Sequence, residues 1–260
     1  MAKGAYIGVD SVARKNKKIY VGVSGVSRKV KNGYAGISGV ARQVFSAGTP
    51  ITTLSVGDTV QVAENGVPVD YLVIQIGTPN SNYSNADGYW LLRKLLGGSG
   101  GYFSQNSDGD QYADYESSYA ASYIRARETA FYNSYGDYLK SVILRPTLPY
   151  YYGYNAAIGT VTASVFHLGK DEIRTQTGAD EKTLDYFQGT TTGTKSDGKR
   201  MAYDSGGTAH PWWLRDASGS GAYLPSYVTG GGTVAKGEVS AYDRPCFIVP
   251  KTIMIEDLLR

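Results

Sequence analysis

The sequence predicts a chain in two parts, a row of short N-terminal β-hairpins followed by a larger, strand-rich α+β domain. Three observations predict this fold class. A short phrase returns with a 14-residue period near the N-terminus. The chain holds 33 Gly and 23 Tyr against 6 Phe, a composition typical of loop-rich β proteins. Helical periodicity is clear in only one stretch, after Ser117.

The first part contains three copies of one unit, which read YIGVDSVARK, YVGVSGVSRK and YAGISGVARQ. Each copy has two short β-prone runs separated by turn formers, so each predicts a small hairpin. A row of two-stranded hairpins cannot form its own core. We therefore interpret residues 1–48 as an attachment or oligomerisation module, with a flexible leader as the alternative. The repeated positions that define this module are Tyr6, Tyr20 and Tyr34 together with Arg14, Arg28 and Arg42.

Basic residues are concentrated in these repeats. Residues 1–46 hold nine Lys or Arg and a single acidic residue, in a chain of net charge +3. Such asymmetry can indicate nucleic-acid binding. Because the charges recur in register with the repeat, the solvated faces of strands explain them better, and nucleic acid is not expected as a partner.

The sequence argues against membrane insertion, against secretion and against a disulfide within the chain. No apolar run approaches the length of a membrane helix, so membrane insertion is not expected. The segment MAKGAYIGVD lacks the apolar region of a signal peptide, which predicts synthesis in the cytoplasm without secretion. Cys246 is the only cysteine, so stability must come from packing or assembly instead of a disulfide.

The second part is expected to span residues 49–260. TLSVGDTVQV and VPVDYLVIQIG predict two strands around the turn ENG, and YWLLRKLL predicts a strand or a short helix. GGSGGYFSQNSDGDQ predicts a flexible, glycine-rich surface excursion. The helical face that follows consists of Ile124, Phe131, Tyr135, Leu139 and Val142.

Strands and turns are predicted for the remainder. GTVTASVFHLG predicts a strand, and KDEIRTQTG predicts a short helix that ends at Gly178. The stretch from HPWWLR to RPCFIVP predicts several strands joined by Gly and Ser turns.

Both parts resemble known families. The 14-residue repeats resemble those at the N-terminus of tail-associated proteins of bacteriophages. The ordered segments LSVGDTVQV, SSYAASYIRARETAFYNSY, VFHLGKDEI, WWLR and YDRPCFIV resemble an uncharacterised domain family common on bacterial surface proteins and phage proteins. That family is similar to the C-type-lectin-like fold of formylglycine-generating-enzyme relatives and of phage receptor-binding proteins. The resemblance implies short, twisted antiparallel sheets with two or three helices.

Candidates for catalysis are few. His167 lies in the apolar run VFHLG and is interpreted as a buried core or edge residue, while His210 precedes a proline in a turn. Neither lies in the spacing of a zinc site. Cys246 is interpreted as a small buried hydrophobe, whereas the oxygen-dependent relatives of the formylglycine fold use paired cysteines. We therefore expect neither enzyme activity nor a cofactor.

A calcium site is a weaker candidate. In NSDGDQYADYE, Asp108 and Asp110 begin the pattern of a calcium loop, but Gln111 and Ser117 stand where the glycine and the bidentate glutamate belong. A looser site on Asp108, Asp110 and the acidic residues that follow stays open beside a solvated acidic loop.

Tyrosine is the main candidate for ligand binding, because it offers a flat surface and a hydroxyl at small entropic cost. Fourteen tyrosines lie between Tyr83 and Tyr154, and a 3-4-4 spacing from Tyr112 to Tyr123 predicts one helical face. Filling of the core is the alternative. Such rings suit either a glycan or a protein ligand. The predicted ligand-binding residues are Tyr83, Tyr102, Tyr112, Tyr115, Tyr119, Trp213, Tyr223 and Tyr227.

The Trp pair belongs to a strand pattern, so the two rings should point to opposite faces. One ring is expected in the core and the other, taken as Trp213, half exposed. Arg215 and Arg244 are expected to brace the last sheet by pairing with Asp216 or Asp243.

These features favour a non-enzymatic bacteriophage adhesin that resides on the virion, as a homotrimer. Residues 1–48 would bind other virion proteins, and the lectin-like part would bind a glycan or protein receptor on the bacterial surface. One alternative is a purely structural collar, decoration or baseplate protein. Another is an enzyme acting on cell-wall glycans, which would need two carboxylates about 5–10 Å apart in a cleft.

Overall fold

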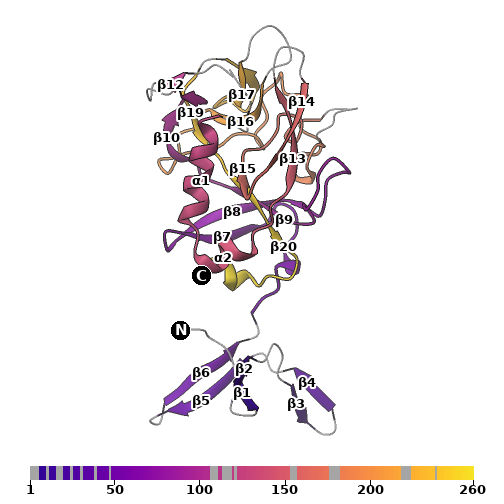
Figure 1. The fold of residues 1–260 in the computed structure, drawn as a ribbon, viewed down its shortest axis with the longest axis vertical. Coiled ribbons are helices and arrows are strands. Elements are labelled where there is room, and N and C mark those ends of the chain that lie inside the picture. Colours follow the sequence, from indigo (N-terminus) through magenta and orange to yellow (C-terminus); the bar gives the residue numbers. More distant parts are fainter. Residues whose placement is uncertain are drawn as a thin grey trace. The chain divides into compact units, whose positions relative to one another are not determined.

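The chain divides into two compact units, Met1–Pro50 and Ile51–Arg260 (Figure 1). The computed structural model describes residues 6–9, 12–15, 20–23, 26–29, 32–37, 40–46, 48–105, 111–112, 119, 122–152, 157–175, 182–217, 224–237 and 239–260. The description is of the backbone alone for residues 6–46, 99, 104–105, 111–112, 152, 157 and 217. The sequence placed the boundary between residues 48 and 49, close to the observed division.

The first unit contains the three hairpins that the repeat predicts. Tyr6 pairs with Lys15 and Tyr20 pairs with Lys29, so the register recurs every 14 residues. The third hairpin has a register shift next to Tyr34. Each hairpin is a separate two-stranded sheet among the described residues. The strands are β1 (Tyr6–Val9), β2 (Val12–Lys15), β3 (Tyr20–Val23), β4 (Val26–Lys29), β5 (Asn32–Ile37) and β6 (Val40–Ser46).

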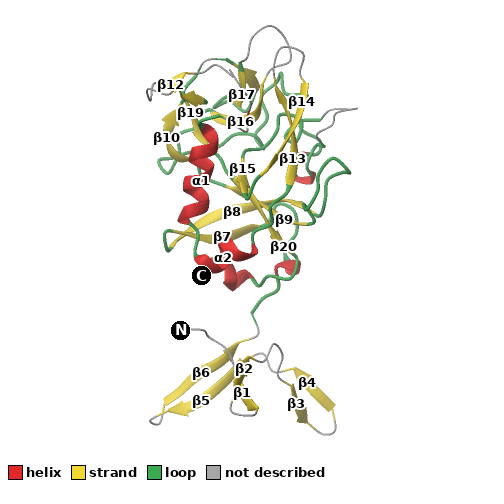
Figure 2. Ribbon diagram, viewed as in Figure 1, coloured by secondary structure: helices red, strands yellow, loops and turns green. Residues whose placement is uncertain are grey.

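The second unit is built on a five-stranded antiparallel sheet in the order β15–β20–β9–β8–β7 (Figure 2). The predicted turn ENG joins β7 to β8, and Asn65 and Gly66 both have a positive φ, 49° and 78°. Paired positive-φ residues match the twist of a tight hairpin. The strands are β7 (Thr59–Glu64), β8 (Val67–Ile76), β9 (Gly88–Arg93), β15 (Val165–Phe166) and β20 (Cys246–Pro250).

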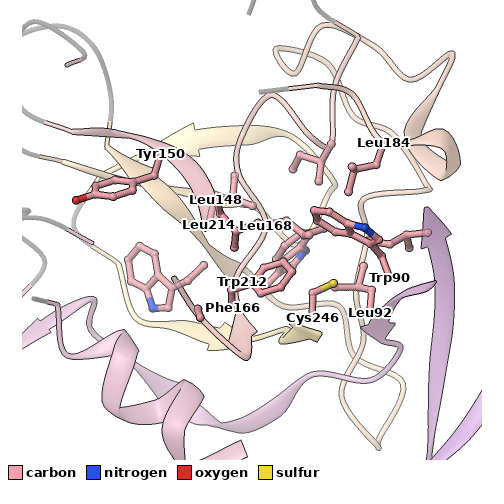
Figure 3. Close-up of a cluster of buried hydrophobic side chains, with 14 of the residues drawn as sticks. Trp90, Leu92, Leu148, Tyr150, Phe166, Leu168, Leu184, Trp212, Leu214 and Cys246 are labelled. Atoms are coloured by element: carbon pink, nitrogen blue, oxygen red, sulfur yellow. The ribbon is translucent and has the colours of Figure 1, made fainter. Parts of the chain in front are cut away.

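Both faces of this sheet are buried, which explains the continuous apolar runs of its central strands. Alternate residues enter different cores: Trp90 and Leu92 belong to one, and Tyr89 and Leu91 to the other. Figure 3 shows the first core, where Trp90 packs edge-on against Phe166 at a ring distance of 5.5 Å. Helical segments supply most of the cover on the opposite face.

A second five-stranded sheet, in the order β10–β19–β16–β17–β18, closes the first core. Here β16 and β19 are parallel, unlike the all-antiparallel sheets that the family resemblance implied. The segment GGSGG, expected as a flexible excursion, is strand β10, and a Cβ at Gly97 would lie 2.4 Å from the Phe131 ring. Glycine is thus required by close packing at that position. The strands are β10 (Gly97–Gly101), β16 (Trp212–Ala217), β17 (Pro225–Val228), β18 (Val234–Lys236) and β19 (Ala241–Asp243).

Two further hairpins complete the strands. The predicted strand GTVTASVFHLG is divided, because β14 ends at Thr162 and pairs with β13 whereas β15 belongs to the first sheet. The 3-4-4 tyrosine spacing does not start in a helix, since Tyr112 lies in a strand. The strands are β11 (Ser104–Gln105), β12 (Gln111–Tyr112), β13 (Thr147–Tyr152) and β14 (Ala157–Thr162).

The predicted helical stretch forms two helices instead of one, α1 (Ile124–Ser134) and α2 (Asp137–Val142). The chain is extended between them at Gly136, where a Cβ would lie 1.9 Å from the carbonyl oxygen of Arg260. The helix predicted after Lys170 is wrong over its described part, because residues 170–174 form a turn and a bend; the end predicted at Gly178 lies outside the described residues. Short 3-10 helices are η1 (Ile51–Thr53), η3 (Asp185–Phe187) and η4 (Ile255–Leu259).

The fold is therefore sheet-rich α+β. Across the described ranges, none of the helices has the length and apolar character that crossing a membrane requires.

Packing at Gly88 gives a test of this sheet arrangement. A Cβ there would lie 2.3 Å from the backbone oxygen of Val249, so Gly88→Ala should force β9 away from β20 and lower the free energy of unfolding by about 2 kcal/mol or more. Gly198→Ala is the matched control, because a Cβ there meets no atom within 4 Å. Denaturant unfolding measures both, and equal stability of the two variants would contradict the register of β9 and β20.

Candidate functional site

Helix α1 carries an unusual group of charges toward the interior. Its first turns contain Arg125, Arg127 and Glu128, and the Glu128 side chain is only 1% exposed. A buried carboxylate is stable only when it is paired and hydrogen-bonded. The partners of Glu128 therefore indicate what this part of the structure is built around.

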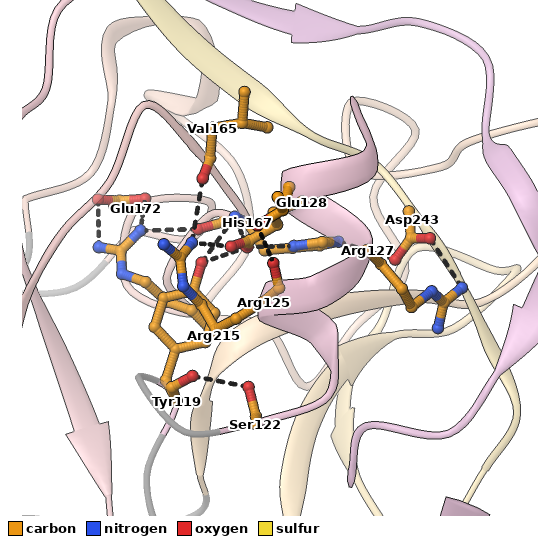
Figure 4. A network of polar contacts seen from close by, with 11 residues as sticks. Tyr119, Ser122, Arg125, Arg127, Glu128, Val165, His167, Glu172, Arg215 and Asp243 are labelled. Carbon is orange, nitrogen blue, oxygen red and sulfur yellow. Dashed lines mark hydrogen bonds and ion pairs between the residues drawn. The ribbon is translucent and has the colours of Figure 1, made fainter. Parts of the chain in front are cut away.

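Glu128 receives four donors (Figure 4). Its Oε1 accepts hydrogen bonds from the Tyr119 hydroxyl, from the backbone N–H of His167 at 2.9 Å and from His167 Nδ1 at 2.7 Å. Its Oε2 pairs with Arg125 Nη1. Because an ionised carboxylate oxygen can only accept hydrogen bonds, His167 Nδ1 must donate to Oε1 and carries a ring proton.

The opposite side of the His167 ring meets a second carboxylate. Nε2 lies 3.2 Å from Asp243 Oδ1, and Asp243 Oδ2 pairs with Arg127 Nη2 at 2.8 Å. The order Arg125–Glu128–His167–Asp243–Arg127, which we term the buried polar chain, thus passes under helix α1. It links the helix to the segment after β15 and to β19.

Burial lowers the pKa of His167, and the Arg127 and Arg125 charges lower it further, against the opposing influence of Asp243. The lowered pKa favours the neutral ring. On the side of Asp243, Nε2 and Oδ1 lie 3.2 Å apart, and this contact opposes the lowering. His167 separates two carboxylates and bonds to one of them.

A second buried ion pair anchors β16 beside this chain. The Arg215 guanidinium donates to both oxygens of Glu172, at 2.5 and 2.8 Å, and to the His167 carbonyl at 3.0 Å. The Tyr83 hydroxyl donates to Glu172 Oε1 at 2.7 Å. Arg215 thus pairs with an acid as predicted, but this acid is Glu172; Asp216 accepts backbone N–H groups, and Asp243 pairs with Arg127 of α1.

Arg244 does not pair with those aspartates either. Its Nε donates to the Arg93 carbonyl at 3.1 Å, and its guanidinium lies 5.1 Å from the centre of the Trp212 ring. Burial lowers the pKa of Arg244 to about 10. Arg244 thus serves to join the end of β9 to the second sheet.

Two cavities open on either side of α1, each at one end of the buried polar chain. The Asp243 cavity has about 330 Å³ and is lined by Glu64, Asn65, Gly98, Arg127, Phe131 and Asp243 among others. The Arg145 cavity has about 280 Å³ and is lined by residues of α1 and of the β14–β15 connection, including Arg125 and Glu128. Both cavities thus share helix α1 as one wall.

The geometry does not suit His167 to act as a general base. A general base must reach a proton of its substrate through a free ring nitrogen, but the His167 side chain is 0% exposed and both nitrogens face carboxylates. The interpretation of His167 as a buried core residue is correct. Cys246 is buried as predicted, and burial raises the pKa of its thiol well above the ordinary value.

Three of the predicted ligand-binding residues are wrong, because they lie in the core. Tyr83 and Tyr119 are buried with their hydroxyls bonded to Glu172 and Glu128. Trp213 is fully buried like its neighbour, since both faces of β16 are covered: Trp212 donates to the Arg200 carbonyl, and Trp213 donates to the Gly101 carbonyl.

The other predicted ligand residues differ in position. Tyr102 is 39% exposed, and Tyr227 is half-buried with its ring 6.0 Å from that of Trp213. Tyr115 and Tyr223 lie outside the described residues, and Tyr112 is described in its backbone alone. The structure does not bring the predicted set together as one surface.

The calcium candidates Asp108 and Asp110 also lie outside the described residues. Within the described segments, no group of three or more His, Cys, Asp or Glu residues could hold a metal ion.

Sequence reasoning missed Glu128 and Glu172 as members of buried ion pairs and assigned Asp243 to other arginines than Arg127. Charged residues in RARE and AYDRP are typical of solvated faces, and their partners lie far away in the sequence. The one available signal was His167 within an apolar run, since a buried histidine requires polar partners.

Comparison with known proteins identifies one similarity. The family model described as "Domain of unknown function (DUF6273)" matches residues 80–251, more than half of the chain, and this range includes α1, the WWLR strand and the RPCFIV strand. No curated protein and no solved structure matches the sequence.

The lowered pKa of His167 predicts a pH dependence of stability. The unfolded chain takes up a proton on this ring near pH 6.5, whereas the folded chain does so only at lower pH. Stability from the neutral ring is therefore fully present above about pH 6.5 and is lost as pH falls toward the lowered value, by at most about 1.4 kcal/mol per pH unit. In His167→Gln this contribution should be absent, which denaturant unfolding between about pH 5 and about pH 7 measures.

His210→Gln is the matched control, because His210 is the only other histidine and lies at the surface beside Asp204. This control should retain the wild-type slope. An unchanged slope in His167→Gln would show that the buried ring does not take up the proton.

Proposed function

The chain belongs to the DUF6273 family, a domain of unknown function, and we propose that it is a non-enzymatic bacteriophage adhesin of the tail or baseplate. Residues 1–48 attach the chain to other virion proteins and assemble it as a homotrimer. Residues 49–260 form a lectin-like body that binds a glycan or protein on the bacterial surface.

The observation that carries this proposal is the contrast between the two units. Each N-terminal hairpin is a two-stranded sheet of its own, and such a sheet is at best marginally stable in water. The second unit has two five-stranded sheets with a core on each face of the first. A C-terminal unit that folds on its own cores, preceded in the sequence by three hairpins that have no core, suits a protein whose N-terminal part requires a partner.

The register of the hairpins supports a repeated attachment surface. Cross-strand partners share one face of a two-stranded ladder. In the first hairpin, Ile7 pairs with Arg14 and Val9 pairs with Val12; fourteen residues later, Val21 pairs with Arg28 and Val23 with Val26. Equivalent aliphatic positions therefore recur on one face of each ladder, together with an arginine at the same place in each repeat. A virion partner with repeated, identical surfaces would fit such a pattern.

A purely structural virion protein is the second candidate. The burial of Tyr83, Tyr119 and Trp213 favours it, since it removes part of the aromatic surface assigned to receptor binding. Tyr102 and the recess beside α1 are the surface features that favour the adhesin.

Deletion of residues 1–48 tests the division of labour. The full chain should be an oligomer by light scattering, and the 49–260 fragment should be a monomer with an unchanged midpoint of thermal unfolding, because its cores lie within its own unit. The labelled fragment should still bind bacterial cells of the host range in a sedimentation assay, while the 1–48 segment should not.

A fragment with the oligomeric state of the full chain would contradict the role of the hairpins. A monomeric fragment that binds no cells would support the structural protein instead.

A further inference from the structure

Most of the residues that line the Arg145 cavity carry polar groups, with Ala163 and Val165 as apolar members. Arg125, Glu128, Thr129 and Tyr132 come from one side of α1, and the rest come from Arg145 and the 162–165 connection. The spacing of the four α1 residues places them on one helical face. The cavity thus lies between a helix and a short loop, both held by the cores beneath.

Arg145 is the charged side chain in this cavity that has no partner among the described residues. Its side chain is exposed and forms no ion pair or hydrogen bond with the described residues. Its backbone is nevertheless fixed: the Arg145 carbonyl accepts from Asn85 Nδ2 at 3.0 Å, and the neighbouring Leu144 N–H donates to the Ile248 carbonyl at 2.9 Å. The positive charge of Arg145 is therefore attached to a fixed point of the backbone at this cavity.

Arg125 contributes further donors at the inner end. Within the described residues its Nη1 donates to Glu128 Oε2 and to the Val165 carbonyl at 3.1 Å, its guanidinium lies 5.3 Å from the centre of the Tyr119 ring, and its side chain is 23% exposed. Because Glu128 compensates the charge of Arg125, Arg145 supplies the net positive charge of the cavity. A second guanidinium still offers N–H groups to an anion.

Hydroxyl groups surround the two guanidinium groups. The Ser164 hydroxyl has no hydrogen-bond partner in the described part of the chain, and Thr129 and Thr162 have hydroxyls that donate within the protein or pair with Thr147. Guanidinium groups match the oxygens of phosphate in a forked geometry, and hydroxyls bind the hydroxyls of a polyol. A purely apolar ligand would leave these donors unsatisfied.

We propose that the Arg145 cavity is a binding site for a phosphate group carried by a polyol or sugar, with Arg145 and Arg125 as the phosphate donors and Ser164 as a hydroxyl partner. This site would supply the receptor contact of the proposed adhesin. It rests on the proposed function in one respect, that the ligand comes from the bacterial surface. Binding of the isolated ligand does not depend on that function.

Calorimetric titration of the full chain with glycerol phosphate tests the proposal. Wild type should bind glycerol phosphate more tightly than inorganic phosphate, and glycerol alone should not bind. Arg145→Ala should weaken binding about 10-fold or more, and Ser164→Ala about 3-fold, as charged and neutral hydrogen bonds differ in strength. Lys94→Ala is the matched control, because it removes an exposed positive charge outside the cavity lining and should leave binding unchanged.

Failure to detect glycerol phosphate binding to wild type at millimolar concentration would overturn the proposal, as would equal weakening in Arg145→Ala and Lys94→Ala. Truncation of Arg145 should not unfold the chain, since this side chain is exposed and has no partner among the described residues.

Cell binding separates the two proposals: glycerol phosphate binding without cell binding retains the site and rejects the adhesin. Equal cell binding by wild type and Arg145→Ala retains the adhesin and shows that its receptor is not the ligand of this cavity.

Discussion

The second unit depends on neutralising two carboxylates that α1 and β19 carry into the interior. An uncompensated buried charge costs several kcal/mol, so Glu128 and Asp243 can be buried only if their partners are in place. His167 is the residue that contacts both, through Nδ1 at 2.7 Å and Nε2 at 3.2 Å. Its backbone carbonyl also accepts from Arg215 of β16. The helix and the two sheets must therefore come together for all of these groups to be satisfied.

This constraint explains where recesses form beside α1. Ion pairs hold the charged side chains of α1 toward the interior. These side chains therefore do not fill the surface on either side of the helix, where the two cavities lie. One recess ends at Asp243 and Arg127, and the other at Glu128 and Arg125. The same ion pairs that stabilise the interior thus give the cavities polar inner ends, which a core of aliphatic residues would not provide.

The sequence predicted the elements whose signals are local. The 14-residue period and the turn formers predicted the three hairpins, and ENG predicted the β7–β8 turn. Placement across long distances could not be predicted: Trp213 is buried because Gly101 and Phe103, more than 100 residues earlier, cover its ring. Likewise, Glu128 and His167 are 39 residues apart, and periodicity holds no information on such pairs. Gly136, at the break between the two helices, lies against the Arg260 backbone, another distant contact.

Native-state hydrogen exchange of the full chain tests the central role of the buried polar chain most directly. If α1 is fixed by these ion pairs, the amides of its second half and the His167 amide should exchange only through opening with the free energy of β9 and β20, the central strands of the first sheet. Exchange of the α1 amides at a much lower free energy, with the sheets still protected, would show that the helix opens alone and that the buried polar chain does not join it to the rest of the fold.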